Sequence, residues 1–165
     1  MPDRSGEDAY SRLLGALDYP MLLLTTATAD ERAGCLVGFA TPCSIEPPRF
    51  LACLSKKNRT FEVARDAGAV VIHALASDAQ DLAELFGGET GDEVDKFERC
   101  AWRPGPEGIP VLDGVPGWFA ARVLARWEAG DHDALLLAPT EAHLGAEFRP
   151  YRTRQGETIQ PGHEP

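Results

Sequence analysis

Apolar stretches in this chain are short, and they end at residues that favour turns. Uninterrupted stretches such as residues 21–24 and 135–138 are far below the roughly 18 residues that a membrane-spanning helix needs. The chain also contains 16 glycines and 13 prolines among 165 residues, and both types interrupt regular structure. The pattern therefore favours many short elements joined by turns over a long helical bundle.

The strand-like segments mostly follow one another through turns. Proline has no N–H to donate, so Pro47 and Pro48 are expected at a strand start or a sheet edge. A strand pattern also returns at Ile109. The clearest expected strands cover residues 21–28, 34–39, 49–54, 69–75, 118–127 and 134–138. Six or seven strands in this order predict a mainly β fold, an antiparallel barrel with helices at its rim, rather than a doubly wound parallel sheet.

Three helices are expected at the rim of the barrel. Asn58 can cap one of them, and Ser77 with Gln80 fits a capping box for another. A polar segment with Val94 and Phe97 is expected to hold a short helix inside a mobile connection. The three main helices are expected over residues 7–18, 58–66 and 77–88.

The whole of residues 1–165 is expected to form one domain, because no repeat, low-complexity tract or linker divides the chain. Its core is expected at about residues 17–152. The chain is polar from Pro150 onward, and residues 153–165 are expected to form a tail that frays at its end. The first ten residues are polar and acidic and show no signal peptide, which favours a cytoplasmic location.

The chain carries 16 Lys and Arg against 26 Asp and Glu, a formal net charge of −10. Such a chain repels phosphate backbones and anionic lipids at long range, so neither nucleic acid nor a membrane is expected as a partner. The one tight basic cluster covers residues 56–59. It is too small to coat a duplex and about the right size for one phosphate group.

The cysteines Cys35, Cys43, Cys53 and Cys100 form no C-x-x-C pair, and no clustered histidines complete a zinc set. No metal site is therefore expected. Without a secretion signal the expected state is a set of reduced, buried thiols, and a disulfide is the minority interpretation.

Two neighbouring segments favour a ligand that joins flat rings to a phosphate. Gly34 and Gly38 let such rings approach the backbone closely, although glycines that relieve crowding in a hairpin would look the same. Residues 55–60, SKKNRT, lie where a strand passes into a helix, and a helix N-terminus favours an anion. An ordinary Asn58 cap with solvated lysines is the alternative for that segment.

A third segment, Gly130-Asp131-His132-Asp133, precedes the last strand. A histidine between two carboxylates is favoured in its protonated form and can contact an anionic or aromatic partner. His73 lies within an apolar strand and is expected to be a hydrogen-bonded core residue. Phosphate-binding glycine loops, the serine hydrolase motif and the zinc protease motif are all absent from the sequence.

The order of these features resembles the flavin reductase-like family, whose fold is the FMN-binding split barrel, an antiparallel fold of Greek-key type. That family carries a glycine-rich strand, a proline pair, a phosphate-binding turn, a helix ending in L-x-x-x-F, a G-x-P-x-L-x-G stretch and a G-D-H motif. The corresponding segments here are SIEPP at 44–48, KNRT at 57–60, LAELF at 82–86, GIPVLDG at 108–114 and GDH at 130–132.

The resemblance implies an NAD(P)H-dependent reductase that transfers a hydride to FMN or FAD, in which the flavin carries the chemistry and no catalytic side chain is required. It also implies a homodimer, and a partner monooxygenase that takes up the reduced flavin. Residues implied to line the flavin rings and ribityl chain are Val37, Gly38, Phe39, Ala40, Thr41, Cys43 and Ser44. Those implied to hold the phosphate are Ser55, Lys57, Asn58 and Thr60, and those implied to place the nicotinamide are Asp131 and His132.

The chain departs from the family at Leu36-Val37-Gly38, where many members have Thr-Ala-Asn or Thr-Ala-Ser, and at Pro42, where serine is frequent. Apolar surface thus replaces a polar contact to the flavin. A flavin-binding or small-ligand carrier without hydride transfer is therefore the alternative function. A purely structural module is a third interpretation, supported only by the acidic surface.

Overall fold

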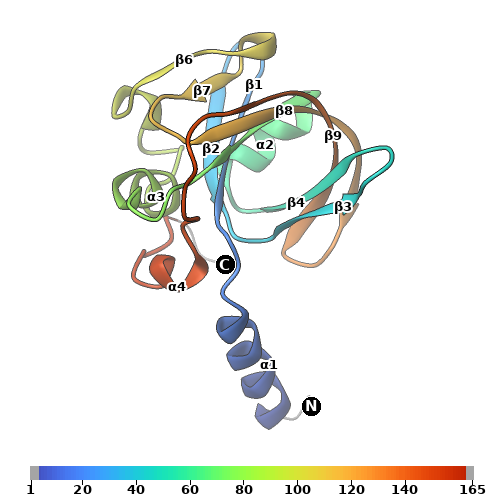
Figure 1. Ribbon diagram of the computed structural model, residues 1–165, viewed down its shortest axis with the longest axis vertical. Helices are drawn as coiled ribbons and strands as arrows, with labels where there is room; N and C mark the ends of the chain where they lie inside the picture. Colours follow the sequence, from blue (N-terminus) through green and yellow to red (C-terminus); the bar gives the residue numbers. More distant parts are fainter. Residues whose placement is uncertain (1–3, 163–165) are drawn as a thin grey trace.

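A computed structural model describes residues 4–162 of the chain (Figure 1). Residues 1–3 of the expected domain and 163–165 of the expected tail lie outside the described residues. The helices are α1 (Arg4–Leu17), α2 (Arg59–Asp66), α3 (Gln80–Gly88) and α4 (Thr153–Gly156), with short 3₁₀ turns η1 (Lys96–Glu98) and η2 (Pro106–Gly108). The strands are β1 (Leu22–Ala27), β2 (Arg32–Val37), β3 (Ala40–Ser44), β4 (Arg49–Ser55), β5 (Ala69–Ala74), β6 (Trp102–Pro104), β7 (Pro110–Leu112), β8 (Gly117–Glu128) and β9 (His132–Leu144).

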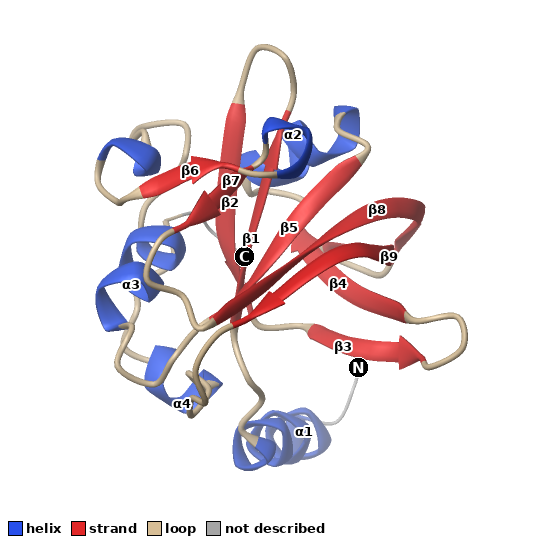
Figure 2. Ribbon diagram, turned by 45° about the horizontal axis from the view of Figure 1, so that its top comes forward, coloured by secondary structure: helices blue, strands red, loops and turns tan. Residues whose placement is uncertain are grey.

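Seven strands form one curved antiparallel sheet in the order β2-β1-β5-β8-β9-β4-β3, and β6 with β7 forms a separate hairpin (Figure 2). Strand β4 lies beside β9, while β5, β8 and β9 are consecutive neighbours, which is a Greek-key arrangement. The predicted mainly β, antiparallel class is confirmed. The expected closure of the barrel is corrected, because within residues 4–162 no ladder joins the edge strands β2 and β3.

Both faces of the central strands are buried, which explains why their sequences are nearly continuous apolar runs. On β1, Leu24 packs inside the curved sheet with Ile72 and Leu135, whereas its neighbour Leu23 packs on the outer face with Phe86. All five side chains are at most 1% exposed. Helix α3, turn η1 and strand β7 cover the outer face (Figure 1).

Three sequence-based expectations are wrong in detail. Helix α3 is preceded by Ala79 with no side-chain cap, and the amide of Ser77 instead donates to the Arg149 carbonyl, so there is no capping box. Residues 40–44, where no strand was expected, form edge strand β3. All four cysteines are free, but Cys43 on β3 is exposed rather than buried.

The polar segment after Pro150 packs against the rest of the chain up to residue 162, and its end, which is expected to fray, lies outside the described residues. Tyr151 is fully buried, and its amide and carbonyl bond the Leu75 carbonyl and the Met21 amide, each at 2.8 Å. Helix α4 follows, and Ile159 packs against the outer-face core. The segment thus belongs to the fold because one aromatic side chain anchors it.

Helix α1 stands apart from the sheet (Figure 1), and its apolar face is uncovered. Tyr10, Leu13 and Leu17 are 63%, 59% and 53% exposed. Helix formation over these residues agrees with the prediction, but their burial does not occur within one chain. No helix among residues 4–162 is long and apolar enough to cross a bilayer.

His73 is a hydrogen-bonded core residue, as expected. Its Nε2 accepts from the Leu112 amide at 3.1 Å, and its Nδ1 lies 3.2 Å from the Leu23 carbonyl, so Nδ1 carries the proton. Burial lowers the pKa of the ring from 6.5 to about 4. The neutral form is therefore the one that the folded chain accommodates.

This burial makes stability depend on pH. The unfolded chain takes up a proton near pH 6.5 and the folded chain only near pH 4, so stability is lost as the pH falls through that window. Between pH 7 and 4.5 the loss from this group is expected to be about 2.5 kcal/mol. Urea unfolding at both pH values, in the wild type and in His73→Gln, measures it. An equal loss in the two proteins would contradict the assignment.

Candidate functional site

A cavity of about 400 Å³ opens between the end of β2, the end of β4, and helices α3 and α4. Its size falls within the range of about 300–1,000 Å³ that is usual for small-ligand sites. The lining is mostly apolar on its walls and polar at one end. It comprises Met21, Cys35, Leu36, Val37, Gly38, Phe39, Cys53, Leu54, Ser55, Asn58, Phe86, Gly87, His132, Thr153, Gly156, Ile159 and Pro161.

The polar end joins two segments that lie more than 70 residues apart in the sequence. Ser55 pairs with His132 in the β4–β9 ladder, and the Lys56 amide donates to the Asp131 carbonyl at 3.0 Å. Residues 55–60, called the phosphate turn below, and the G-D-H motif therefore meet at one edge of the cavity. This juxtaposition follows from the antiparallel register, in which the last residue of β4 faces the first residue of β9.

An aromatic contact covers the same edge. The Phe39 ring lies 5.0 Å from the His132 ring, centroid to centroid, tilted by 58°. Phe39 is 58% exposed although it lines the cavity. Behind it, His132 Nδ1–H donates to Asp131 Oδ1 at 2.7 Å, and this bond lowers the pKa of the Asp131 carboxyl. Asp131 therefore orients the imidazole and does not itself line the cavity.

The residues implied by the resemblance separate into two groups. Lining the cavity are Val37, Gly38, Phe39, Ser55, Asn58 and His132. Outside its lining lie Ala40, Thr41, Cys43 and Ser44, which run along β3, and also Lys57, Thr60 and Asp131. The division falls after Phe39, where the chain enters the edge strand β3.

The turn before α2 has the geometry of an anion site but little uncompensated positive charge. The Asn58 side chain accepts from the Thr60 amide at 2.9 Å, as expected for a cap. Lys56 is paired with Glu128, and Arg59 holds Glu31 through two bonds of 2.7 and 2.8 Å. Lys57 is exposed, with no carboxylate within 4 Å among the residues described.

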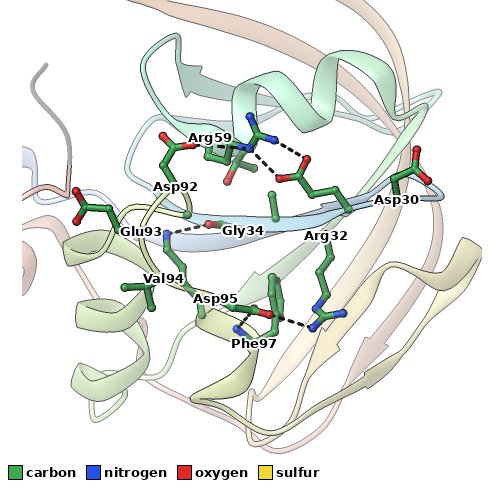
Figure 3. Close-up of a pocket in the computed structure, with 14 residues that line it drawn as sticks. Asp30, Arg32, Gly34, Arg59, Asp92, Glu93, Val94, Asp95 and Phe97 are labelled. Carbon is green, nitrogen blue, oxygen red and sulfur yellow. Dashed lines mark hydrogen bonds and ion pairs between the residues drawn. The ribbon is translucent and has the colours of Figure 1, made fainter.

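A second cavity, of about 360 Å³, lies between the β1–β2 turn, the start of α2 and residues 91–97 (Figure 3). It is lined by charged side chains that pair with one another: Arg59 reaches Glu31 and lies 3.8 Å from Asp92, and Arg32 bonds Asp95 at 3.2 Å. Lys96 is buried at its floor and donates to the Gly34 and Phe86 carbonyls at 3.1 Å. Acidic residues outnumber basic ones in this lining, so a phosphate is disfavoured there.

Two thiols line the first cavity, and neither is activated. Burial raises the pKa of Cys35 to about 11 and also raises the pKa of Cys53. The thiolate is the nucleophilic form of cysteine, so both side chains act at neutral pH as small apolar surface. Among the described residues no group of three or more His, Cys, Asp and Glu side chains is placed to hold a metal ion.

Several lining residues were missed from the sequence. Leu36 fills a space over Gly87: a Cβ on Gly87 would lie 2.7 Å from Leu36 Cδ2. A large residue at 36 is thus matched by the absence of a side chain at 87. The other unpredicted side of the cavity comes from Thr153, Gly156, Ile159 and Pro161, in the segment that was expected to form a polar tail.

The lining fits a flat, mostly apolar ring system attached to a polar chain. Three glycines, Gly38, Gly87 and Gly156, bring backbone close to the cavity, while aliphatic and aromatic side chains supply its walls. Hydroxyl, amide and imidazole groups are concentrated at the α2 end. FMN has this division into an apolar ring and a phosphorylated chain.

Comparison with known proteins finds relatives that are named as flavin reductases or as the reductase subunit of a flavin-dependent enzyme. An FMN reductase (NADH) RutF of Cronobacter sakazakii is 35% identical over 133 residues, 78% of this chain and 75% of that one. A "Probable flavin reductase" of Rhizobium meliloti is 34% identical over 113 residues, and the match covers 66% of this chain but only 35% of that protein. The reductase subunit HsaB of a flavin-dependent monooxygenase from Mycobacterium tuberculosis is 27% identical over 123 residues, 74% of this chain and 64% of that one.

Among solved structures, the NADH:FAD oxidoreductase SgcE6 of Streptomyces globisporus superposes with a TM-score of 0.81 at 20% identity, covering 91% of this chain and 89% of that one. At that identity the likeness shows the fold. The model of the flavin reductase like domain matches residues 14–158, nearly the whole chain. The motifs, the fold and this match agree, and the chain belongs to the flavin reductase-like family.

Proposed function

We propose that this chain is an NAD(P)H-dependent flavin reductase that transfers a hydride from the nicotinamide to FMN or FAD. The observation that carries the proposal is the 400 Å³ cavity, apolar along its walls, whose polar end joins the phosphate turn to His132. Bound flavin supplies the hydride-accepting ring. The chain supplies the bed for that ring and holds the two reactants at contact distance.

The two ends of the cavity bind different parts of the reactants. Ser55 and Asn58 bind the phosphorylated chain at the start of α2, where the helix dipole favours an anion. Phe39 and His132 form the outer wall, against which the nicotinamide stacks. Asp131 fixes the His132 ring in one orientation through the 2.7 Å bond.

Purified protein mixed with FMN or FAD tests the function directly. We expect a flavin-dependent rise in melting temperature and oxidation of NADH or NADPH, followed at 340 nm, that requires added flavin. Flavin binding without nicotinamide oxidation would favour the carrier alternative. Neither binding nor turnover would reject both.

His132→Ala is expected to raise the KM for the nicotinamide about tenfold and to leave the Kd for FMN within about twofold. The substitution removes one face of the nicotinamide wall, worth about 1.4 kcal/mol, but no contact to the phosphate turn. Steady-state kinetics with each nicotinamide and an FMN titration separate the two effects. A pure carrier would show no nicotinamide dependence to change.

The supported partners are flavin and nicotinamide, and three finer assignments are proposals. A homodimer is supported by the uncovered stripe of Tyr10, Leu13 and Leu17 on α1, and light scattering at several concentrations measures it. A separate monooxygenase receiving reduced flavin is supported by the name of the Mycobacterium relative. A cytoplasmic location is supported by four free cysteines.

A further inference from the structure

We propose that Asp18, at the end of α1, is a positioning residue that holds the C-terminal wall of the flavin cavity in place. The inference rests on the proposed function, since it assigns flavin to that cavity. The wall is the segment of residues 152–162. It contributes Thr153, Gly156, Ile159 and Pro161 to the lining, facing the β2 end of the cavity.

The wall cannot hold its own position. Helix α4 is only four residues long, and one isolated helical turn has no stability of its own. Its side chains are also largely exposed: Thr153 and Gly156 are half-buried, and Arg154 and Gln155 face solvent. Its placement must therefore come from contacts with other parts of the chain.

Asp18 provides three of these contacts. Its Oδ1 accepts from the Arg154 amide at 3.0 Å and from the Thr153 hydroxyl at 3.3 Å, so it caps the first turn of α4 from another element. Its carbonyl accepts from Arg152 Nη1 at 2.9 Å. The neighbouring Tyr19 carbonyl accepts from the Thr153 amide at 2.9 Å.

The backbone at Asp18 is strained in a way that serves this contact. Its φ is +53°, in the left-handed region that side chains other than Asn, Asp and Gly rarely adopt. Glu107, with φ of +56°, is the one other non-glycine residue of this kind among residues 4–162. At Asp18 the left-handed turn ends α1 and presents the carboxylate to α4. Strain of this kind persists where the surroundings require it.

The wall fits against the cavity with no spare room. A Cβ on Gly156 would lie 2.9 Å from Met21 Sδ, and one on Gly162 would lie 2.5 Å from the Glu89 backbone. Met21, like Gly156, lines the cavity. A shift of α4 therefore changes the width of the slot that accepts the flavin ring, and Asp18 opposes that shift.

Asp18→Gly is the sharpest test, because glycine tolerates the positive φ while the carboxylate is lost. We expect the Kd for FMN, measured by quenching of flavin fluorescence, to rise about tenfold. We expect hydrogen exchange at the Arg154 amide to accelerate by a similar factor, with or without FMN. Asp18→Asn keeps an acceptor and tolerates the same φ, so its Kd should stay within about twofold of the wild type. Glu107→Gly makes the matched change at an exposed position outside the cavity lining and should alter neither quantity.

The outcomes distinguish this proposal from the function on which it rests. If the wild type binds FMN and Asp18→Gly binds it equally well, the positioning role is overturned and the reductase is not. If Asp18→Gly lowers the melting temperature by many degrees and Asp18→Asn does not restore it, the effect is global and the role is again overturned. If the wild type binds neither FMN nor FAD, the proposed function fails, and this inference fails with it.

Discussion

Replacing Tyr151 with alanine is expected to lower the free energy of unfolding by about 4 kcal/mol. The side chain is fully buried in the outer-face core, in one cluster with Leu23 and Phe86. Alanine would leave a cavity there that the rigid strand β1 cannot close. The Tyr151 hydroxyl also donates to Gln80 Oε1 at 2.6 Å, and that bond at the start of α3 would be lost.

Urea unfolding of Tyr151→Ala and Tyr151→Phe separates packing from hydrogen bonding. The phenylalanine variant keeps the ring and loses only the hydroxyl, so we expect it to cost about 1 kcal/mol. A loss below about 1 kcal/mol in the alanine variant would mean that residues after Pro150 are not part of the core. The fold described here would then be wrong at its C-terminal end.

The sheet was largely predictable because its strands are buried on one or both faces. Continuous apolar runs marked β1 and β5, and the proline pair marked the turn before β4. These are local signals, set by residues that are adjacent in the chain. Strand β3 was missed because its side chains are mostly exposed and it contains Pro42, so it lacks the alternation of a half-buried strand.

The packing of the segment after Pro150 was not predicted, because its burial depends on a distant partner. Residues after Pro150 have a polar composition, and one tyrosine in such a segment is not a local signal of order. The pairing of Tyr151 with Leu75 and Met21 joins positions 76 and 130 residues away, and only the folded chain brings them together.

Charge at the candidate site was misjudged for a similar reason. The cluster at residues 56–59 looked like free positive potential. In the structure Glu128, at the end of β8, pairs with Lys56, and Glu31, in the turn between β1 and β2, pairs with Arg59. What remains for an anion is Lys57, the Asn58-capped helix start and the neighbouring polar groups. The proposed phosphate site is therefore small, with no large basic patch around it.

Gly38→Leu is expected to weaken FMN binding about a thousandfold and to abolish flavin-dependent NADH oxidation. Gly38 lines the cavity, and a Cβ built there would meet only the Met21 Cε, at an ordinary contact distance of 3.4 Å. The backbone therefore accepts a side chain, and that side chain occupies the space assigned to the flavin ring. A thousandfold change corresponds to about 4 kcal/mol of binding free energy.

The matched control fills the other cavity. Gly91 lines the cavity beside Arg59, and a Cβ there would lie 3.2 Å from the Arg59 Cβ, a tight contact that requires the two segments to separate by a few tenths of an ångström. Gly91→Leu should leave the Kd for FMN within about threefold of the wild type. The reverse result, with binding lost in Gly91→Leu and kept in Gly38→Leu, would assign flavin to the charged cavity instead. Both variants add the same side chain, so their comparison decides which of the two cavities binds flavin. Thermal melting of each variant measures any general loss of stability separately.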